Sequence, residues 1–97
     1  MKRTLVTIVT ESVLERRLVE DIKRLGAHGY TLTEARGEGA RGARAADWEH
    51  NANIRMETIC EKAVAEAIVT HLANTYYAHY AMITFSQEVE VMRPEKF

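Results

Sequence analysis

Four stretches of the chain have the composition or period of β-strands, and two stretches between them have the period of helices. This order constrains the fold more than any other feature. Leu5–Val9 carries Leu, Val, Thr and Ile on both faces, as in a strand buried on both sides. Tyr30–Ala35 is rich in Tyr and Thr, and Ile54–Cys60 alternates apolar with polar residues. A fourth strand is predicted from about Met82 to Met92, and Pro94 ends it.

The first helical stretch follows the first strand. Its apolar residues recur at helical spacing and predict a buried stripe of Leu14, Leu18, Ile22 and Leu25. Ser12 and Glu15 stand three residues apart, which is the spacing of a capping box and predicts that Ser12 caps the helix. Gly26 is the predicted stop, because glycine readily takes the left-handed conformation that ends many helices.

The second helical stretch is predicted from about Lys62 to Tyr76. Its periodicity predicts a buried stripe of Val64, Ala67, Ile68, His71 or Leu72, and Thr75. This helix leads directly into the last predicted strand.

The elements follow the order β-α-β-loop-β-α-β, which is the split βαβ or ferredoxin-like pattern. The sequence therefore predicts one α+β domain over residues 1–97, a ferredoxin-like βαββαβ sandwich with both helices on one face of an antiparallel sheet. Nothing in the chain is predicted to cover the other face. A chain this short buries only about 60–65% of its unfolded surface, so a second chain is expected to cover that face.

Charge and composition exclude several classes of protein. The 13 basic and 14 acidic residues give a net charge of −1, which argues against a basic nucleic-acid-binding domain and a polybasic membrane-surface domain. The apolar runs are too short for a transmembrane helix or a signal-peptide core. The single cysteine, Cys60, excludes an internal disulfide and a Cys-rich zinc site. We therefore expect a cytoplasmic protein with no metal, no nucleic-acid partner and no membrane insertion.

No catalytic motif accompanies the ionisable residues. The four histidines include no pair at i, i+4 and lie in no Cys/His cluster: His28, His50, His71 and His79. Glu88 and Glu90 share one face of a predicted strand, where acidic residues are usually solvated. Cys60 lies on the apolar side of its strand and is expected to be a small core residue. The sequence therefore predicts no catalytic residue and no enzyme.

The stretch Arg36–Asn53 is long for a connection between two strands and holds three of the five glycines. Gly37 and Gly39 allow the backbone to approach a ligand and to point N–H groups at an anion. Arg41 and Arg44 add forked donors suited to phosphate. The same composition also suits a solvated hairpin tip, and spacing alone leaves both interpretations open. No Gly-Lys-Ser/Thr follows, which excludes a nucleotide-hydrolysing P-loop.

Three tyrosines gather at one predicted corner, in the run 76–80 between the second helix and the last strand. Such a cluster suits packing across a partner surface or the wall of a ligand site. Packing across a partner surface is favoured over the wall of a ligand site.

Four short motifs, in order along nearly the whole chain, resemble those of PII-like signalling proteins. Residues 8–11 resemble the end of the first strand in that family, and 26–31 resemble its Gly-Ala-x-Gly-Tyr-Thr turn. Residues 37–44 resemble the base of its T-loop, Gly-x-Gly-Ser-Arg-x-x-Arg, and 76–81 resemble its B-loop, Tyr-Phe-x-x-Tyr-Ala. The greatest similarity is to the PII-like proteins of inorganic-carbon acquisition, of the cyanobacterial carbon-sensing and carboxysome-associated types.

The resemblance implies a homotrimer that binds adenine nucleotides in clefts between neighbouring subunits. A long T-loop, here about residues 36–53, would report the bound state to a partner. By resemblance, the nucleotide phosphates would be held by Gly37, Gly39, Arg41 and Arg44. The adenine would meet Thr31 and the backbone around Ile59, and the cleft would be closed by the corner of Ala81, Met82 and Ile83.

Several positions depart from the family pattern. Ala40 stands in place of the T-loop serine, and Met82 in place of a B-loop glycine. The chain lacks the modifiable T-loop tyrosine and the Lys/Gly-rich B-loop of ordinary PII proteins, which argues against uridylylation and 2-oxoglutarate sensing. It reaches Phe97 without a Cys-containing C-terminal extension, which favours the carboxysome-associated type. In that type, bicarbonate is reported alongside ADP or AMP.

The leading hypothesis is a regulatory protein that binds ADP or AMP, together with bicarbonate, and acts on a bicarbonate transporter or a carboxysome-related partner. The alternatives are a slow nucleotide-hydrolysing enzyme on the same fold and a ligand-free oligomeric scaffold. An acylphosphatase would need an Arg-bearing loop after the first strand, where residues 10–13 are acidic. A ferredoxin-like RNA binder would need aromatic residues on the exposed faces of the first and third strands, and Leu5–Val9 has none.

Overall fold

The computed structural model describes residues 1–39, 42–43 and 52–97. Two helices of ten and 15 residues, a four-stranded sheet, a small two-stranded ladder and two short 3₁₀ turns make up the described chain. In chain order the elements are β1 (Lys2–Glu11), the 3₁₀ turn η1 (Ser12–Leu14), α1 (Glu15–Arg24), β2 (Thr31–Ala35), β3 (Glu38–Gly39), β4 (Gly42–Ala43), β5 (Asn53–Cys60), α2 (Lys62–Tyr76), β6 (Met82–Glu90) and the 3₁₀ turn η2 (Pro94–Lys96).

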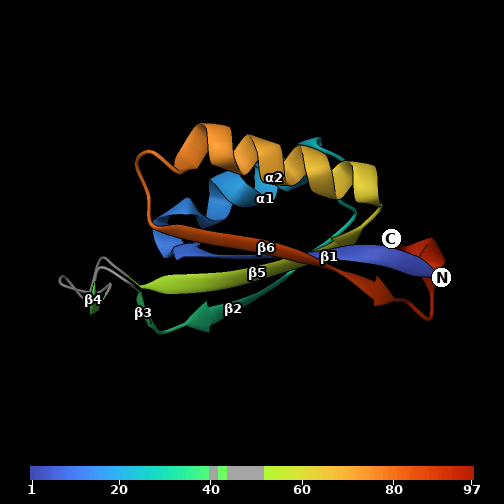
Figure 1. The fold of residues 1–97 in the computed structure, drawn as a ribbon, viewed down its shortest axis with the longest axis horizontal. Coiled ribbons are helices and arrows are strands. Elements are labelled where there is room, and N and C mark those ends of the chain that lie inside the picture. The colour runs from blue at the N-terminus through green and yellow to red at the C-terminus, as the bar shows by residue number, and fades with distance from the viewer. Residues whose placement is uncertain (40–41, 44–51) are drawn as a thin grey trace.

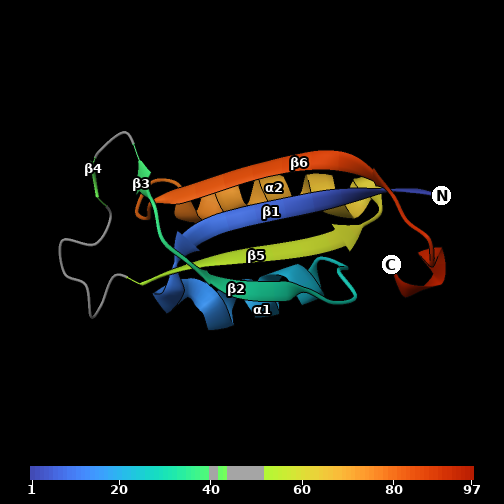
Figure 2. The same ribbon diagram turned by 90° about the horizontal axis from the view of Figure 1, so that it is seen from below.

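The main sheet has the strand order β2-β5-β1-β6, and every neighbouring pair is antiparallel. β1 lies at its centre, paired with β5 over Thr4–Glu11 and with β6 over Lys2–Thr10. Both helices lie on one face of the sheet (Figure 1), and the view from below shows the strands uncovered (Figure 2). The predicted α+β ferredoxin-like fold is therefore confirmed.

The core fills the space between this sheet and the two helices. β1 contributes Val6 and Ile8, β5 contributes Met56, and α1 contributes Leu18 and Ile22, all with no exposed surface. Because side chains alternate along a strand, only the even-numbered residues of β1 and β5 reach this core. The predicted alternation of β5 and three of the four stripe residues of α1 are confirmed, and the fourth, Leu25, packs partly buried against the core.

The capping box predicted at Ser12 is wrong. β1 continues to Glu11, and the backbone N–H of Ser12 donates to the carbonyl of Ala52 at 2.7 Å, so Ser12 is still tied to the neighbouring strand. A 3₁₀ turn then precedes α1, which begins at Glu15 with no side-chain cap. The N-cap position of the helix therefore moves from the predicted Ser12 to Leu14, two residues later.

The ends predicted for the second helix are confirmed, and its predicted buried stripe is correct at Ile68 and at Leu72. The stripe is wrong at Ala67, and it misses Ala65 and Tyr76. The buried residues of α2 are Ala65, Ile68, Leu72 and Tyr76, whereas Ala67 is exposed and Thr75 is half-buried. The helix is turned so that Tyr76 enters the core, where its hydroxyl donates to the half-buried carboxylate of Asp21.

The stretch predicted to be one loop holds a small ladder that the sequence did not indicate. Glu38 pairs with Ala43, and Gly39 pairs with Gly42. The strand after the predicted loop begins at Asn53 itself. Residues 40–41 and 44–51 of this stretch, which include Arg41 and Arg44, lie outside the described residues.

The open face of the sheet carries the odd-numbered residues of its strands. Ile83 and Phe85 of β6 are 49% and 43% exposed there, although both are large and apolar. Beside them, Thr7 donates to Glu57 at 3.1 Å, and Arg55 donates to the same carboxylate at 3.1 Å. No helix of the described residues covers this face, as the sequence predicts.

Gly26 ends α1 in a Schellman arrangement, as predicted. Its N–H donates to the carbonyl of Lys23 at 3.1 Å, and the N–H of Ala27 donates to that of Ile22 at 2.9 Å. Gly26 has a φ of 118°, and a Cβ at this position would lie 3.1 Å from a methyl carbon of Val64.

Gly26→Ala should therefore lower the free energy of unfolding by about 1–3 kcal/mol, since a side chain is strained in this region and crowds α2. Urea denaturation monitored by circular dichroism measures the change. Gly29→Ala is the matched control, because a Cβ there has no neighbour within 4 Å. Equal stability of the two variants would contradict the role given to Gly26.

Candidate functional site

Thr31 and Ile59, which the resemblance assigns to an adenine, border one cavity of about 370 Å³. The cavity lies at the end of the sheet where β2 begins and β5 ends, beside the chain termini (Figure 2). Its full lining is Leu5, His28, Gly29, Tyr30, Thr31, Glu57, Thr58, Ile59, Lys96 and Phe97. The structure thus brings these two predicted residues together.

The turn between α1 and β2 builds one wall of this cavity. The hydroxyl of Thr58, which is 2% exposed, donates to the carbonyl of Gly29 at 2.7 Å and fixes the turn against β5. Tyr30 follows, half exposed, with the ammonium of Lys23 6.0 Å from its ring centre. Tyr30 therefore borders this cavity while its ring also lies close to α1.

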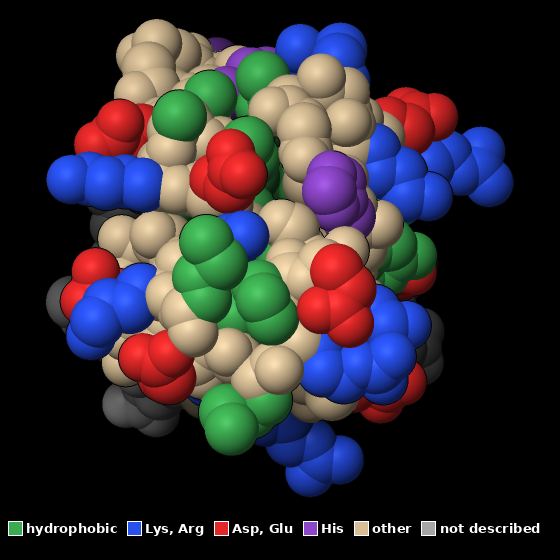
Figure 3. Space-filling model, turned by 90° about the vertical axis from the view of Figure 1, so that its right-hand side faces the viewer, with side chains coloured by type: hydrophobic (Ala, Val, Ile, Leu, Met, Phe, Trp, Pro, Cys, Tyr) green, Lys and Arg blue, Asp and Glu red, His purple; other side chains and the backbone are tan. Residues whose placement is uncertain are grey.

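The C-terminal residues build the opposite wall, which no pattern in the sequence indicated. The η2 turn places Lys96 and Phe97 beside the cavity, far in sequence from the strands that form its floor. Figure 3 looks onto this end of the molecule, where hydrophobic side chains gather near the middle and charged ones surround them. Two aromatic residues, an aliphatic floor and the Glu57 carboxylate suit a flat ring with hydrogen-bonding edges.

Gly37, Ala81 and Met82 lie at the other end of the sheet. Gly37 is exposed, and a Cβ placed on it would meet nothing within 4 Å, so the described chain leaves open space around it. Ala81 is exposed, with its N–H donating to a carboxylate oxygen of Glu11 at 3.0 Å and its carbonyl accepting from Thr10 at 2.8 Å. The side chain of Met82 packs against the core.

One chain does not bring the two groups of predicted residues together. Asn53, at the loop end of β5, and Ile59 are six residues apart along one strand, which is about 20 Å at the usual rise. Of the remaining predicted residues, Gly39 is described in its backbone alone, and Arg41 and Arg44 lie outside the described residues.

A polar cluster lies between the two helices, and sequence reasoning missed it. The carboxylate of Asp21 accepts hydrogen bonds from the hydroxyl of Tyr76, from Nε2 of His71 at 2.9 Å and from Arg24 at 3.3 Å. The guanidinium of Arg17 lies 4.9 Å from the Tyr76 ring centre. Asp21 and Tyr76 are 55 residues apart in sequence, so no local pattern could pair them.

The cluster shifts the pKa values of Asp21 and Tyr76. Burial opposes the charge on Asp21, but the hydrogen bonds from Tyr76, His71 and Arg24 outweigh it and hold the pKa of the carboxyl below its ordinary value. Burial, together with the bond to the Asp21 carboxylate, raises the pKa of Tyr76 to about 12. Tyr76 therefore stays a neutral donor at physiological pH.

Tyr76 also anchors the corner that leads to Ala81. Its carbonyl accepts the N–H groups of His79 and Tyr80, each at 3.0 Å, and its ring meets that of Tyr80 edge to face at 6.0 Å. Two of the three corner tyrosines, Tyr76 and Tyr80, thus pack within the chain itself, whereas Tyr77 is 46% exposed.

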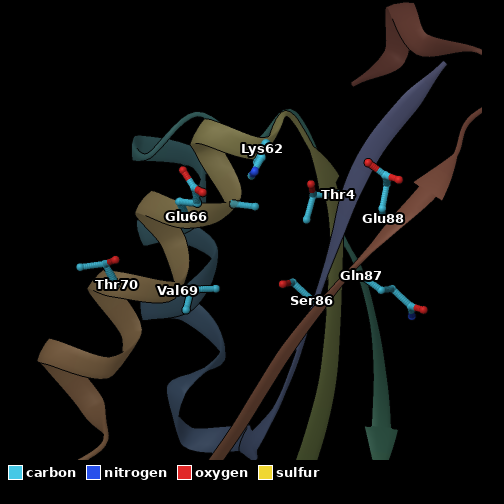
Figure 4. A pocket seen from close by; sticks show the side chains of 9 residues that line it. Thr4, Lys62, Glu66, Val69, Thr70, Ser86, Gln87 and Glu88 are labelled. Atoms are coloured by element: carbon cyan, nitrogen blue, oxygen red, sulfur yellow. The ribbon is translucent and has the colours of Figure 1, made fainter.

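A second cavity, of about 570 Å³, runs between α2 and β6 (Figure 4). Lys62, Glu66 and Val69 line it from the helix, and Ser86 and Glu88 line it from the strand. None of the residues assigned by resemblance borders this cavity.

The other chemical expectations concern Cys60, metals and membranes. Cys60 is buried, and burial together with the nearby Glu61 raises the pKa of its thiol, which suits the predicted core role. Across 1–39, 42–43 and 52–97, no group of three or more His, Cys, Asp or Glu side chains could hold a metal ion. No helix in the same ranges is long and apolar enough to cross a membrane.

Comparison with known proteins decides the family. The model of the family described as nitrogen regulatory protein P-II matches residues 3–96. This chain belongs to the P-II family. A PII-like signalling protein from Thermus thermophilus is 54% identical, with a TM-score of 0.87 over 100% of this chain and 96% of that chain.

More distant PII-like structures share the fold. CPII from Thiomonas intermedia K12, bound to ADP and bicarbonate, is 18% identical, with a TM-score of 0.87 over 100% of this chain and 95% of its own. CPII bound to ADP, AMP and bicarbonate is 20% identical, with a TM-score of 0.88 over 100% of this chain and 94% of its own. The family relationship makes the chain a PII-like regulatory protein.

Proposed function

We propose that this PII-like protein is a cytoplasmic homotrimer that senses ADP or AMP, together with bicarbonate, and regulates inorganic-carbon acquisition. The observation that carries the proposal is the cavity beside Thr31 and Ile59, which lies at the opposite end of the sheet from Gly37 and Ala81. Two copies of the chain can place these two halves on either side of one nucleotide, whereas a single copy cannot.

The cavity suits the adenine ring. Tyr30 and Phe97 offer aromatic surfaces, and the carboxylate of Glu57 can accept a hydrogen bond from an exocyclic amino group. Thr31 is exposed and adds a hydroxyl at the mouth. A concave site that combines apolar and aromatic surface with a few polar groups is the usual form of a site for a small ligand.

The phosphates are assigned to the other half of the cleft. In the proposed complex, Arg41 and Arg44 provide guanidinium donors, and Gly37 and Gly39 provide close backbone N–H groups. The corner of Ala81 and Met82 closes the cleft. Ligand binding orders the T-loop, and the ordered T-loop sets the affinity for a protein partner such as a bicarbonate transporter or a carboxysome-related protein.

The carbon-sensing part of the proposal is supported by the CPII structures, which hold ADP and bicarbonate and share the fold of this chain. Calorimetric titration of the purified protein with AMP, ADP, ATP and cyclic AMP, with and without bicarbonate, tests it. We expect ADP or AMP to bind most tightly, with an affinity that bicarbonate changes. Absence of binding to all four nucleotides would instead support the ligand-free scaffold, and release of phosphate during the titration would support slow hydrolysis.

The open sheet face carries a prediction about assembly. Light scattering should give a mass of about three chains, because burying Ile83 and Phe85 against a neighbour supplies apolar contact that a chain of this size lacks. Phe85→Asp should give monomers, since a charge would be buried at the interface. Tyr77→Asp is the control, because Tyr77 is comparably exposed but follows the end of α2, away from the sheet face. A stable wild-type monomer at micromolar concentration would contradict both the trimer and a site between subunits.

A further inference from the structure

The carboxylate of Glu11 occupies a backbone donor at the corner assigned to the phosphate half of the cleft. Glu11 is the last residue of β1, and its Oε2 accepts a hydrogen bond from the N–H of Ala81 at 3.0 Å. The hydroxyl of Thr10 donates to the carbonyl of Ala81 at 2.8 Å. The end of β1 therefore engages both backbone polar groups of Ala81.

Glu11 lies between this corner and the base of the T-loop. In the sheet it stands opposite Asn53, which stands opposite Ala35 at the end of β2. Neighbouring strands are about 4.8 Å apart, so Glu11 is about 10 Å from Ala35, and Gly37 follows two residues later. Figure 2 shows the end of β1, the end of β2 and the start of β6 at the same end of the molecule.

The Glu11 carboxylate has no ion-pair partner within residues 1–39, 42–43 and 52–97. The nearby Arg55 pairs with Glu57. Oδ1 of Asn53, 7% exposed, is a further acceptor and has no hydrogen-bond partner among these residues. The Glu11 carboxylate therefore lies at the corner where the proposed function puts anionic phosphates.

We propose that Glu11 sets the phosphate-charge preference of this nucleotide site, an inference that rests on the proposed function. A phosphate oxygen that reaches the corner competes with the Glu11 carboxylate for the Ala81 N–H, and the carboxylate also repels the phosphate charge. Adenosine carries no phosphate, so neither the competition for the Ala81 N–H nor the charge repulsion affects its binding. The penalty grows from AMP to ADP to ATP, so Glu11 biases the site toward the less charged nucleotides.

Glu11→Gln separates this role from a structural one. The glutamine amide oxygen can still accept from Ala81 N–H, so the corner keeps its hydrogen bond while the negative charge is removed. A unit charge about 5 Å away in a water-like dielectric changes affinity by about fourfold. We therefore expect Glu11→Gln to bind ADP about three- to tenfold more tightly and ATP more strongly still, with less than about a twofold change for adenosine.

The experiment is calorimetric titration of adenosine, AMP, ADP and ATP in EDTA, at low and at high salt. Glu20→Gln is the control, because it removes the same charge from the exposed surface of α1. The gain for Glu11→Gln should shrink at high salt, because salt screens exposed charges. Glu11→Ala loses both the charge and the acceptor. If the charge sets the preference, this variant should show the same order of affinity gains among the four ligands as Glu11→Gln.

The possible failures are distinguishable. If wild-type protein binds these ligands and Glu11→Gln leaves their relative affinities unchanged, or weakens all four equally, the role given to Glu11 is overturned and the proposed function stands. If neither the wild type nor any variant binds any adenine compound, the proposed function fails, and the role of Glu11 fails with it.

Discussion

Asp21→Ala is expected to lower the free energy of unfolding by about 2–4 kcal/mol. The substitution removes the acceptor of the Tyr76 hydroxyl, and Tyr76 is only 1% exposed. It also removes the carboxylate that His71 and Arg24 contact. An unsatisfied buried donor alone costs about 1–3 kcal/mol. Chemical denaturation at pH 7 measures the loss. Glu20→Ala, one position earlier on the exposed side of α1, is the matched control and should change stability by less than about 0.5 kcal/mol.

The contribution of Asp21 should also depend on pH. The folded-state pKa of Asp21 lies below its ordinary value of 3.8, so its ionised form is favoured by folding. Its stabilising effect is therefore fully present well above pH 3.8 and is lost as the pH falls through 3.8 and below. The wild type should lose its advantage over Asp21→Asn as the pH falls from 5 to 2. A stability difference that stays constant over that range would contradict this account.

Arg44→Ala is expected to weaken ADP binding about tenfold to a hundredfold. Under the proposed function, Arg44 donates paired N–H groups to phosphate, and a hydrogen bond to a charged group contributes about 1.5–3 kcal/mol. Arg41→Ala should behave similarly. Calorimetry measures the change, and adenosine is the control ligand because it has no phosphate to lose.

Arg44→Lys should restore only part of the affinity, because an ammonium cannot reproduce the forked donors of a guanidinium. The circular-dichroism spectra of these variants should match that of the wild type. If Arg41→Ala and Arg44→Ala both bind ADP within twofold of the wild type, the phosphate role of the loop is wrong, and the solvated-hairpin interpretation replaces it.

The order of elements could be predicted because each strand and helix has its own period, which is a local property. The ends of α2 were predicted correctly for the same reason. The rotation of α2 about its axis could not be predicted, because it depends on a residue distant in sequence. The hydrogen bond between Tyr76 and Asp21 decides which side of α2 is buried. Ser12 does not cap the helix because its N–H donates to the carbonyl of Ala52, which comes just before β5 and after a long loop.

The candidate site was predictable in part. Thr31 belongs to a short motif that resembles a known family, and Ile59 was assigned through the same resemblance. The structure places both at one cavity. Phe97 and Lys96 could not be foreseen there, since only the return of the chain beside β1 brings them to that end of the sheet. The engagement of Ala81 by Glu11 likewise joins residues 70 positions apart.

The central place of β1 in the sheet affects how the protein is made. β1 is synthesised before the other described elements, yet its partner β5 begins at Asn53 and its partner β6 begins at Met82. Lys2 pairs with Glu90, so the sheet cannot be completed until Glu90 has been synthesised. The most deeply buried strand therefore stays without its hydrogen-bonding partners for most of translation. Such late, long-range pairing slows folding and exposes an apolar strand to aggregation while the ribosome finishes the chain.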